Sequence, residues 1–106
     1  MSLKTLNVNY NISGGDHVFE AIQLDNDNLA ISVIYTGINS TDAELRLEQS
    51  VDGINFNEVP GSNQTINNAK PSHMFNILAK RGLFIRLVLI IHSATAGLIN
   101  KINALT

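Results

Sequence analysis

The side chains of this sequence that could do chemistry are carboxylates, histidines and hydroxyls, because the chain contains no cysteine. Asp25 and Asp27 alternate with asparagine in the stretch LDNDN, and oxygen-rich loops of this kind can bind calcium. The glycine and distal glutamate of an EF-hand loop do not follow, and Ca²⁺ takes about six to eight oxygen ligands. A turn between two strands therefore explains LDNDN better, with Asp25 and Asp27 as the calcium candidates.

The three histidines are His17, His73 and His92. No two of them have the close spacing that places two imidazoles on one metal ion, so we predict neither a histidine metal site nor a cofactor. The sequence also lacks a Gly-x-Ser-x-Gly motif. A fold can still assemble a Ser-His-Asp triad from distant residues. With no local signature, however, we predict no catalytic residue and a protein that is not an enzyme.

A further candidate is Asp52, which precedes Gly53 in the stretch QSVDGINFNEV. An acid beside a flexible glycine could be catalytic, but no partner acid, base or metal ligand lies near it in the sequence. An Asp-Gly pair between two alternating apolar runs is typical of the tip of a hairpin, because glycine readily adopts the positive φ of a tight turn. We interpret Asp52 and Gly53 as a structural turn. Replacing Gly53 with valine should then damage folding rather than a chemical step.

Composition excludes several classes of protein. A chain of 106 residues is expected to form one domain, over 1–106. The formal charge is −2 and only 7 residues are basic, so we expect no nucleic acid and no anionic membrane as partner. The N-terminal residues do not resemble a signal peptide, and the apolar stretch 83–92 contains Arg86 and is too short for a transmembrane helix. The lack of cysteine favours assembly in a reducing cytoplasm.

Apolar residues alternate with period two along most of the chain, and helical periodicity is nearly absent. The predicted strands cover residues 3–12, 17–24, 29–36, 42–51, 55–59, 64–67, 73–79, 83–92 and 97–104. Turn signals separate these strands at intervals of roughly 8–12 residues. The pattern predicts an all-β fold, a single antiparallel β-sandwich of about eight strands that is either Ig-like or jelly-roll-like. Residues 74–80 could form a helical turn instead.

The alternation also predicts which side chains face the core. In the strand over 42–51, the inward residues are Ala43, Leu45, Leu47 and Val51, and the outward residues are Glu44, Arg46, Glu48 and Ser50. In the strand over 17–24, Val18, Ile22 and Leu24 share one face, opposite Phe19 and Ala21. The strand over 83–92 is apolar on both faces, so we predict that it is a central strand covered on both sides.

The stretch LRLEQSVDGINFNEVPG, residues 45–61, resembles small β-sandwich modules of tailed-bacteriophage virion proteins. The shared pattern is an alternating strand, then Ser-x-Asp-Gly-x-Asn-aromatic, then a short strand. GLFIRLVLII, residues 82–91, is similar to their penultimate strand. The resemblance covers most of the second half of the chain, and the first half fits only in its strand spacing. It implies a structural virion protein with no active site, of the capsid auxiliary or decoration type.

This resemblance also implies partners. These are the major capsid protein or other virion proteins, contacted by several copies or by a homo-oligomer, in a virion assembled in the host cytoplasm. The first strand and the loop over 62–72 are the candidate contact surfaces. The Ser-x-Asp-Gly-x-x-aromatic hairpin also resembles discoidin-like carbohydrate-binding sandwiches, in which the aromatic residue is usually Trp and the domain is longer. Here Phe56 takes that place. A carbohydrate-binding adhesion module on a phage fibre or tail is therefore the alternative function.

Overall fold

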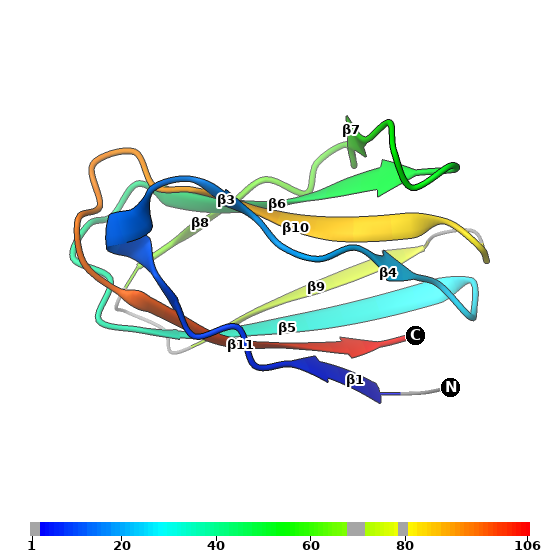
Figure 1. The fold of residues 1–106 in the computed structure, drawn as a ribbon, viewed down its shortest axis with the longest axis horizontal. Helices are drawn as coiled ribbons and strands as arrows, with labels where there is room; N and C mark the ends of the chain where they lie inside the picture. The colour runs from blue at the N-terminus through cyan, green and yellow to red at the C-terminus, as the bar shows by residue number, and fades with distance from the viewer. Residues whose placement is uncertain (1–2, 68–71, 79–80) are drawn as a thin grey trace.

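The structure is a computed structural model that describes residues 3–67, 72–78 and 81–106. Two antiparallel β-sheets pack face to face, which confirms the predicted all-β sandwich (Figure 1). The strands in the described residues are β1 (Leu3–Leu6), β2 (Tyr10–Asn11), β3 (His17–Val18), β4 (Ile22–Gln23), β5 (Asn28–Thr36), β6 (Ala43–Ser50), β7 (Asn57–Glu58), β8 (Gln64–Ile66), β9 (Ser72–Leu78), β10 (Phe84–Ile90) and β11 (Leu98–Leu105). One 3-10 turn, η1, spans Ile12–Gly14. No helix of the described part is long and apolar enough to cross a membrane.

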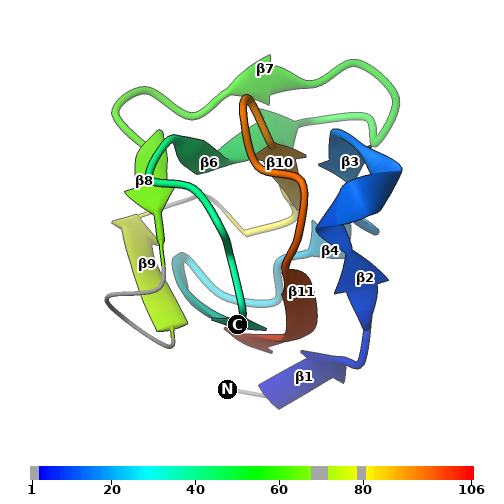
Figure 2. The ribbon, with the colours of Figure 1, turned by 90° about the vertical axis from the view of Figure 1, so that its left-hand side faces the viewer.

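The pairing of the strands identifies the type of sandwich. Sheet A has the order β1-β11-β5-β9, with β2 also paired to β11. Sheet B has the order β3-β10-β6-β7, with β4 also paired to β10 and β8 to β6. The pairs β1/β2, β3/β4 and β7/β8 are therefore interrupted strands that each fill one position (Figure 2). Numbered by position, the sheets read 1-8-3-6 and 2-7-4-5, which is the order of a jelly roll.

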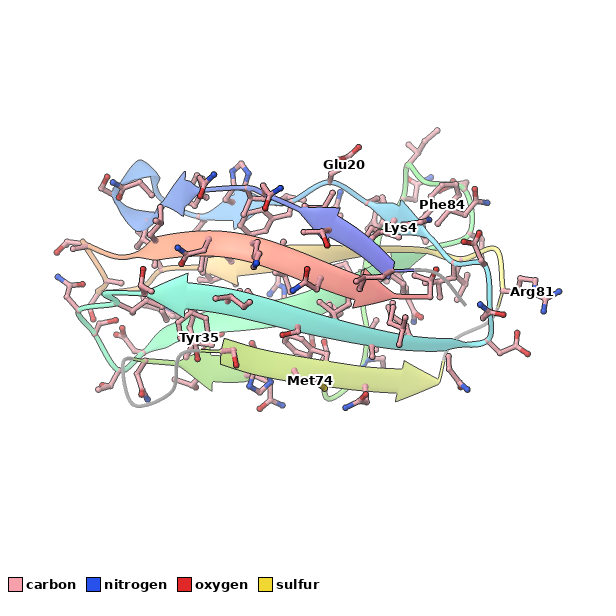
Figure 3. The ribbon with its side chains drawn as sticks, turned by 90° about the horizontal axis from the view of Figure 1, so that it is seen from below. Lys4, Glu20, Tyr35, Met74, Arg81 and Phe84 are labelled. Carbon is pink, nitrogen blue, oxygen red and sulfur yellow. The ribbon has the colours of Figure 1, made fainter. Side chains whose placement is uncertain are left out.

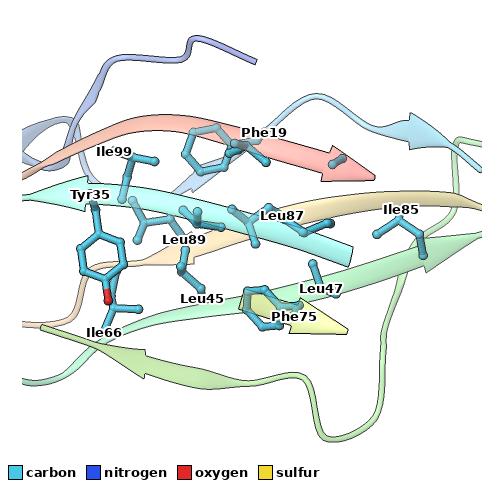
Figure 4. Close-up of a cluster of buried hydrophobic side chains, with 14 of the residues drawn as sticks. Phe19, Tyr35, Leu45, Leu47, Ile66, Phe75, Ile85, Leu87, Leu89 and Ile99 are labelled. Atoms are coloured by element: carbon cyan, nitrogen blue, oxygen red, sulfur yellow. The ribbon is translucent and has the colours of Figure 1, made fainter. Parts of the chain in front are cut away.

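The core lies between the two sheets and consists mainly of aliphatic side chains (Figure 4). The inward residues of β5 and β10 are Leu29, Ile31, Val33, Tyr35, Ile85, Leu87 and Leu89. Burying one such side chain contributes about 1.5–3 kcal/mol. As predicted, β10 is a central strand, paired with β3 and β4 along one edge and with β6 along the other. The cover predicted for both faces is complete only on the inner face, because on the outer face Val88 is buried while Phe84, Arg86 and Ile90 are half-buried. The prediction of a strand near 73–79 is also confirmed, because β9 is extended over its whole described length. Residues 79–80 lie outside the described residues.

Two predictions about the end of β6 were wrong. Val51 was expected inside the core but is 83% exposed, because β6 ends at Ser50 and the chain then leaves the sheet. Ser50 was expected to face water but is only 4% exposed. It does lie on the outer face, opposite Phe84 of β10, but the loop that follows it folds back over its hydroxyl group. The alternation of apolar and polar residues predicts which side chains of a strand face the core. It does not show at which residue the strand loses its pairing partner.

The two predicted N-terminal strands are each interrupted. The strand over 3–12 breaks between β1 and β2, where Asn9 has a φ of 44°. The strand over 17–24 breaks between β3 and β4. There Phe19 is buried and Val18 is exposed, which reverses the predicted faces at this point. Because residues 19–21 leave the regular ladder, Phe19 and Ile22 both reach the core.

Candidate interaction loop

Asp52 and Gly53 lie in the loop of residues 50–56, between β6 and β7, which we call the Asp52 loop (Figure 1). The last paired residues are Gln49 and Asn57, so the loop is wider than a two-residue hairpin turn. Gly53 has a φ of 76°, the positive value expected of the turn glycine. The stretch is therefore a turn, but one large enough to have its own internal structure.

The carboxylate of Asp52 organises this loop. Its Oδ1 accepts hydrogen bonds from the backbone N–H groups of Asn55 (2.9 Å) and Ile54 (2.8 Å) and from the hydroxyl of Ser50 (2.7 Å). Its Oδ2 accepts one from the side-chain amide of Asn55 (2.8 Å). These donors, led by the two backbone N–H groups, hold the pKa of Asp52 well below its usual range. Asp52 is therefore ionised at neutral pH and fully used in holding the loop, which does not suit a general acid.

The hydroxyl of Ser50 supports the loop from the other side. Its Oγ accepts hydrogen bonds from the backbone N–H groups of Asp52 (3.2 Å) and Gly53 (2.9 Å). The same hydroxyl donates to Asp52 Oδ1. Ser50 and Asp52 together bind four consecutive backbone N–H groups, those of residues 52–55. The residues of the motif Ser-x-Asp-Gly-x-Asn thus hold the loop in this conformation through their own hydrogen bonds.

Aromatic contacts attach the Asp52 loop to the outer face of sheet B. The guanidinium carbon of Arg86 lies 3.9 Å from the centre of the Phe56 ring, a cation–π contact. Arg86 is itself held by Glu48, whose Oε1 lies 2.7 Å from Nη2 of Arg86. At the tip of the loop, a Cβ atom on Gly53 would lie 3.4 Å from the ring of Phe84. The loop therefore rests on β10 and does not extend freely into solvent.

Two large apolar side chains lie on the outer surface of this loop, beside the exposed polar residues Asp52 and Asn55. Val51 is 83% exposed and Ile54 is 81% exposed, although large aliphatic side chains of a small domain are usually better covered. A hollow of about 390 Å³ lies beside Val51. It is lined by Gln49, Ser50, Val51, Asp52, Asn55, Asn57 and Leu83. A loop that is already ordered loses little conformational entropy on binding, so Val51 and Ile54 are positioned to contact a partner.

Sequence reasoning identified the loop but missed these two side chains. It assigned Val51 to the core and gave Ile54 no role. The sequence feature that points to their exposure is their position: Val51 directly precedes Asp52-Gly53 and Ile54 directly follows it. In a loop of this width, both residues lie outside the sheet. The width of the loop was not visible in the sequence, because Asp-Gly also fits a two-residue turn.

The histidines lie at separate places in the fold. His17 stacks on Tyr10 with ring centres 4.2 Å apart, and His73 meets Phe75 edge to face at 4.7 Å. The Nε2 atom of His92 lies 3.3 Å from Oε1 of Glu44. Among residues 3–67, 72–78 and 81–106, no three or more histidines and carboxylates are grouped so that they could hold a metal ion.

Ser93 directly follows His92, the histidine that pairs with Glu44, so these three residues are candidates for a catalytic triad. The hydroxyl of Ser93 lies 2.7 Å from both carboxylate oxygens of Asp42, and this hydrogen bond lowers the pKa of Asp42. In a catalytic triad the nucleophilic hydroxyl is hydrogen-bonded to the histidine. Here Ser93 donates to Asp42, and His92 pairs with Glu44 of β6. The two pairs attach the turn after β10 to the start of β6 and do not form a triad.

The calcium candidates contact different parts of the fold. Asp25 Oδ2 lies 3.8 Å from Lys4 Nζ and accepts a 3.4 Å hydrogen bond from the hydroxyl of Thr106. Asp27 Oδ1 accepts a hydrogen bond of 3.2 Å from the backbone N–H of Arg81. Both carboxylates connect the turn between β4 and β5 to neighbouring segments. The calcium hypothesis stays a prediction.

The second predicted contact surface, residues 62–72, begins inside sheet B. The buried Oγ of Ser62 accepts a hydrogen bond from the N–H of Leu47 (3.0 Å) and donates one to its carbonyl oxygen (3.2 Å). Ser62 thus takes the place of a strand residue between β7 and β8. Residues 68–71 lie outside the described residues.

Comparison with known proteins does not add to this description. No protein-family model, no curated protein and no solved structure matches the chain.

Proposed function

We propose that this protein is a non-enzymatic structural component of a tailed-bacteriophage virion, of the capsid auxiliary or decoration type. In this proposal several copies, or a homo-oligomer, bind the major capsid protein or other virion proteins, in virions that assemble in the host cytoplasm. A jelly-roll sandwich is compatible with this role, since both viral capsid domains and lectins use that fold. The fold alone does not determine function, so the proposal depends on a site.

The observation that carries the proposal is the Asp52 loop. The residues behind the resemblance to virion modules are the same residues that fix the loop: Ser50, Asp52, Asn55 and Phe56. Their polar groups are used within the loop, while Val51 and Ile54 remain exposed. Such a loop offers an apolar contact to another protein surface at a low entropic cost.

The first test is mass spectrometry of virions purified from the phage that encodes the chain. We expect the protein in stoichiometric, multiple-copy amounts. The second test is incorporation of the double variant V51S/I54S during assembly. Both positions are highly exposed, so its stability should change by no more than about 0.5 kcal/mol, whereas its incorporation should fall at least about tenfold.

The matched control is V18S/L105S. It removes two other exposed aliphatic side chains, one on β3 of sheet B and one on β11 of sheet A, and both lie outside the first strand and the loop over 62–72. We expect this variant to be incorporated like the unmodified protein. Virions that lack the protein would refute the structural role, and equal incorporation of V51S/I54S and the unmodified protein would refute the role of the loop.

The alternative function, a carbohydrate-binding adhesion module on a fibre or tail, has one supporting feature, the aromatic residue of the hairpin motif. That residue is Phe56, and the guanidinium of Arg86 lies on its ring at 3.9 Å. A sugar would have to stack on the other face of the ring. A glycan array with the purified protein tests this alternative, because binding to any sugar that F56A abolishes would favour it over virion assembly.

A further inference from the structure

The sandwich has four edge positions, and three of them are interrupted. β1/β2, β3/β4 and β7/β8 consist of pieces of two to four residues. The fourth edge, β9, runs without interruption over the seven residues Ser72–Leu78 (Figure 3). It pairs with β5 in regular register along its whole length. An edge strand presents unpaired N–H and C=O groups, and short or interrupted edges discourage other chains from pairing with them.

β9 also lacks the charges that protect edge strands. Lys4 lies in β1, Glu20 between β3 and β4, and Glu58 in β7. The sequence of β9, SHMFNIL, contains no Asp, Glu, Lys, Arg or Pro. Met74, near its middle, is 58% exposed (Figure 3). Within the part of the chain that the structure describes, no strand pairs with the outer edge of β9.

A groove runs beside this edge. It has a volume of about 500 Å³ and lies between β9 and the segment 59–64 of sheet B. Its lining residues are Val59, Pro60, Gly61, Ser62, Gln64, His73, Met74, Phe75 and Asn76. None of these is Asp, Glu, Lys or Arg. The side of β9 that faces sheet B is therefore open at this edge and carries no charge that would oppose an added strand.

We propose that β9 pairs in antiparallel fashion with β9 of a second copy of this chain, so that two A sheets become one continuous sheet. A two-fold contact places the same surface against itself, so that surface must tolerate its own charges. β9 meets this condition, because no charged residue of one β9 faces a like charge of the other. The edges that carry Lys4, Glu20 or Glu58 do not meet it.

The size of the contact predicts its strength. Seven extended residues span about 23 Å, and one added strand buries less than the roughly 1,200 Å² of a stable interface. We therefore expect a concentration-dependent equilibrium between monomer and dimer. Many copies on one assembly would strengthen this contact, but the pairing itself does not depend on the proposed virion function.

Sedimentation equilibrium over a range of protein concentrations tests the pairing. We expect the unmodified protein to dimerise reversibly, and M74K/N76K to dimerise at least about tenfold more weakly because each new lysine faces one from the partner. The matched control is L3K/T5K, which places two lysines at exposed positions of β1, on the opposite edge of the same sheet. It should dimerise like the unmodified protein. Circular dichroism verifies that all three proteins are folded.

Amide hydrogen exchange of the unmodified protein gives a readout that needs no variant. Exchange in β9 should slow as concentration rises, while exchange in β1 stays constant. A protein that is monomeric up to about millimolar concentration, with constant exchange in β9, would overturn the proposal. Dimerisation that M74K/N76K leaves intact, or that L3K/T5K abolishes, would overturn it too, since the contact would then lie elsewhere. Absence of the protein from virions would refute the proposed function and leave this inference unaffected.

Discussion

The outer faces of the two sheets differ in chemistry although both cover the same core. On sheet B, Arg86 and Arg46 lie on either side of Glu48, and Arg46 also reaches Glu58 at 3.6 Å. The Asp52 loop then covers one end of this face. On sheet A, the outward residues are Leu3, Thr5, Ala30, Ser32, Ile34, Met74, Asn76, Lys101, Asn103 and Leu105. Among these ten residues, Lys101 alone carries a charge.

The two faces differ in how their outward side chains find partners. The charged side chains of sheet B are matched within the molecule, so that face is completed by its own residues. The outward residues of sheet A form few such pairs, and the free edge of that sheet is β9. In a jelly roll the outward side chains, and not the fold, decide which surface is available for binding.

The largest effect is expected from removing the anion that links the arginines of sheet B. Glu48→Ala should lower the free energy of unfolding by about 1.5–3 kcal/mol, because Arg86 loses a short charged hydrogen bond at a mostly buried carboxylate. The comparable change on sheet A is Asn103→Ala, which removes the acceptor of the Thr5 hydroxyl. It should change stability by less than about 0.5 kcal/mol. Urea unfolding measures both, and equal losses would contradict the contrast between the faces.

A smaller loss is expected from the loop that covers sheet B. Gly53→Val puts a β-branched residue at a φ of 76°, beside the ring of Phe84, and should destabilise the protein by about 1–2 kcal/mol. Gly53→Asn is the control, since asparagine tolerates this conformation better. We expect it to retain most of the stability in thermal unfolding. If Gly53→Val were as stable as Gly53→Asn, the loop would not depend on the positive φ at position 53.

The smallest expected effect is a loss of stability at acidic pH that depends on Asp52. The pKa of Asp52 is lower in the folded than in the unfolded protein, so the unfolded state binds its proton first as pH falls. The stabilisation by Asp52 is therefore complete above about pH 4, the ordinary range of an aspartate, and declines below it. Asp52→Asn removes this dependence. Between pH 6 and pH 2.5, the urea midpoint should fall less in the variant than in the unmodified protein, and parallel curves would exclude an ionised Asp52 as the centre of the loop.

Much of the fold could be predicted because its central strands obey simple alternation. Leu29 to Tyr35 in β5 and the apolar residues of β10 were identified from local pattern alone. The breaks in the edge strands could not be found in this way, since they depend on which neighbour each strand pairs with. Asp52 and Gly53 were recognised as a turn from residue type. The exposure of Val51 could not be, because it follows from the point at which β6 loses its partner.

The position of β11 has a consequence for folding. It lies between β1 and β5, and Leu3 pairs with Leu105 from the other end of the sequence (Figure 1). Sheet A thus cannot close until residues 98–105 have left the ribosome, and contacts of such long sequence separation make folding slow. Until then both neighbours of β11 present unpaired backbone to the cell. The nascent chain is therefore prone to aggregate until residues 98–105 have left the ribosome, and a chaperone would be needed most in that interval.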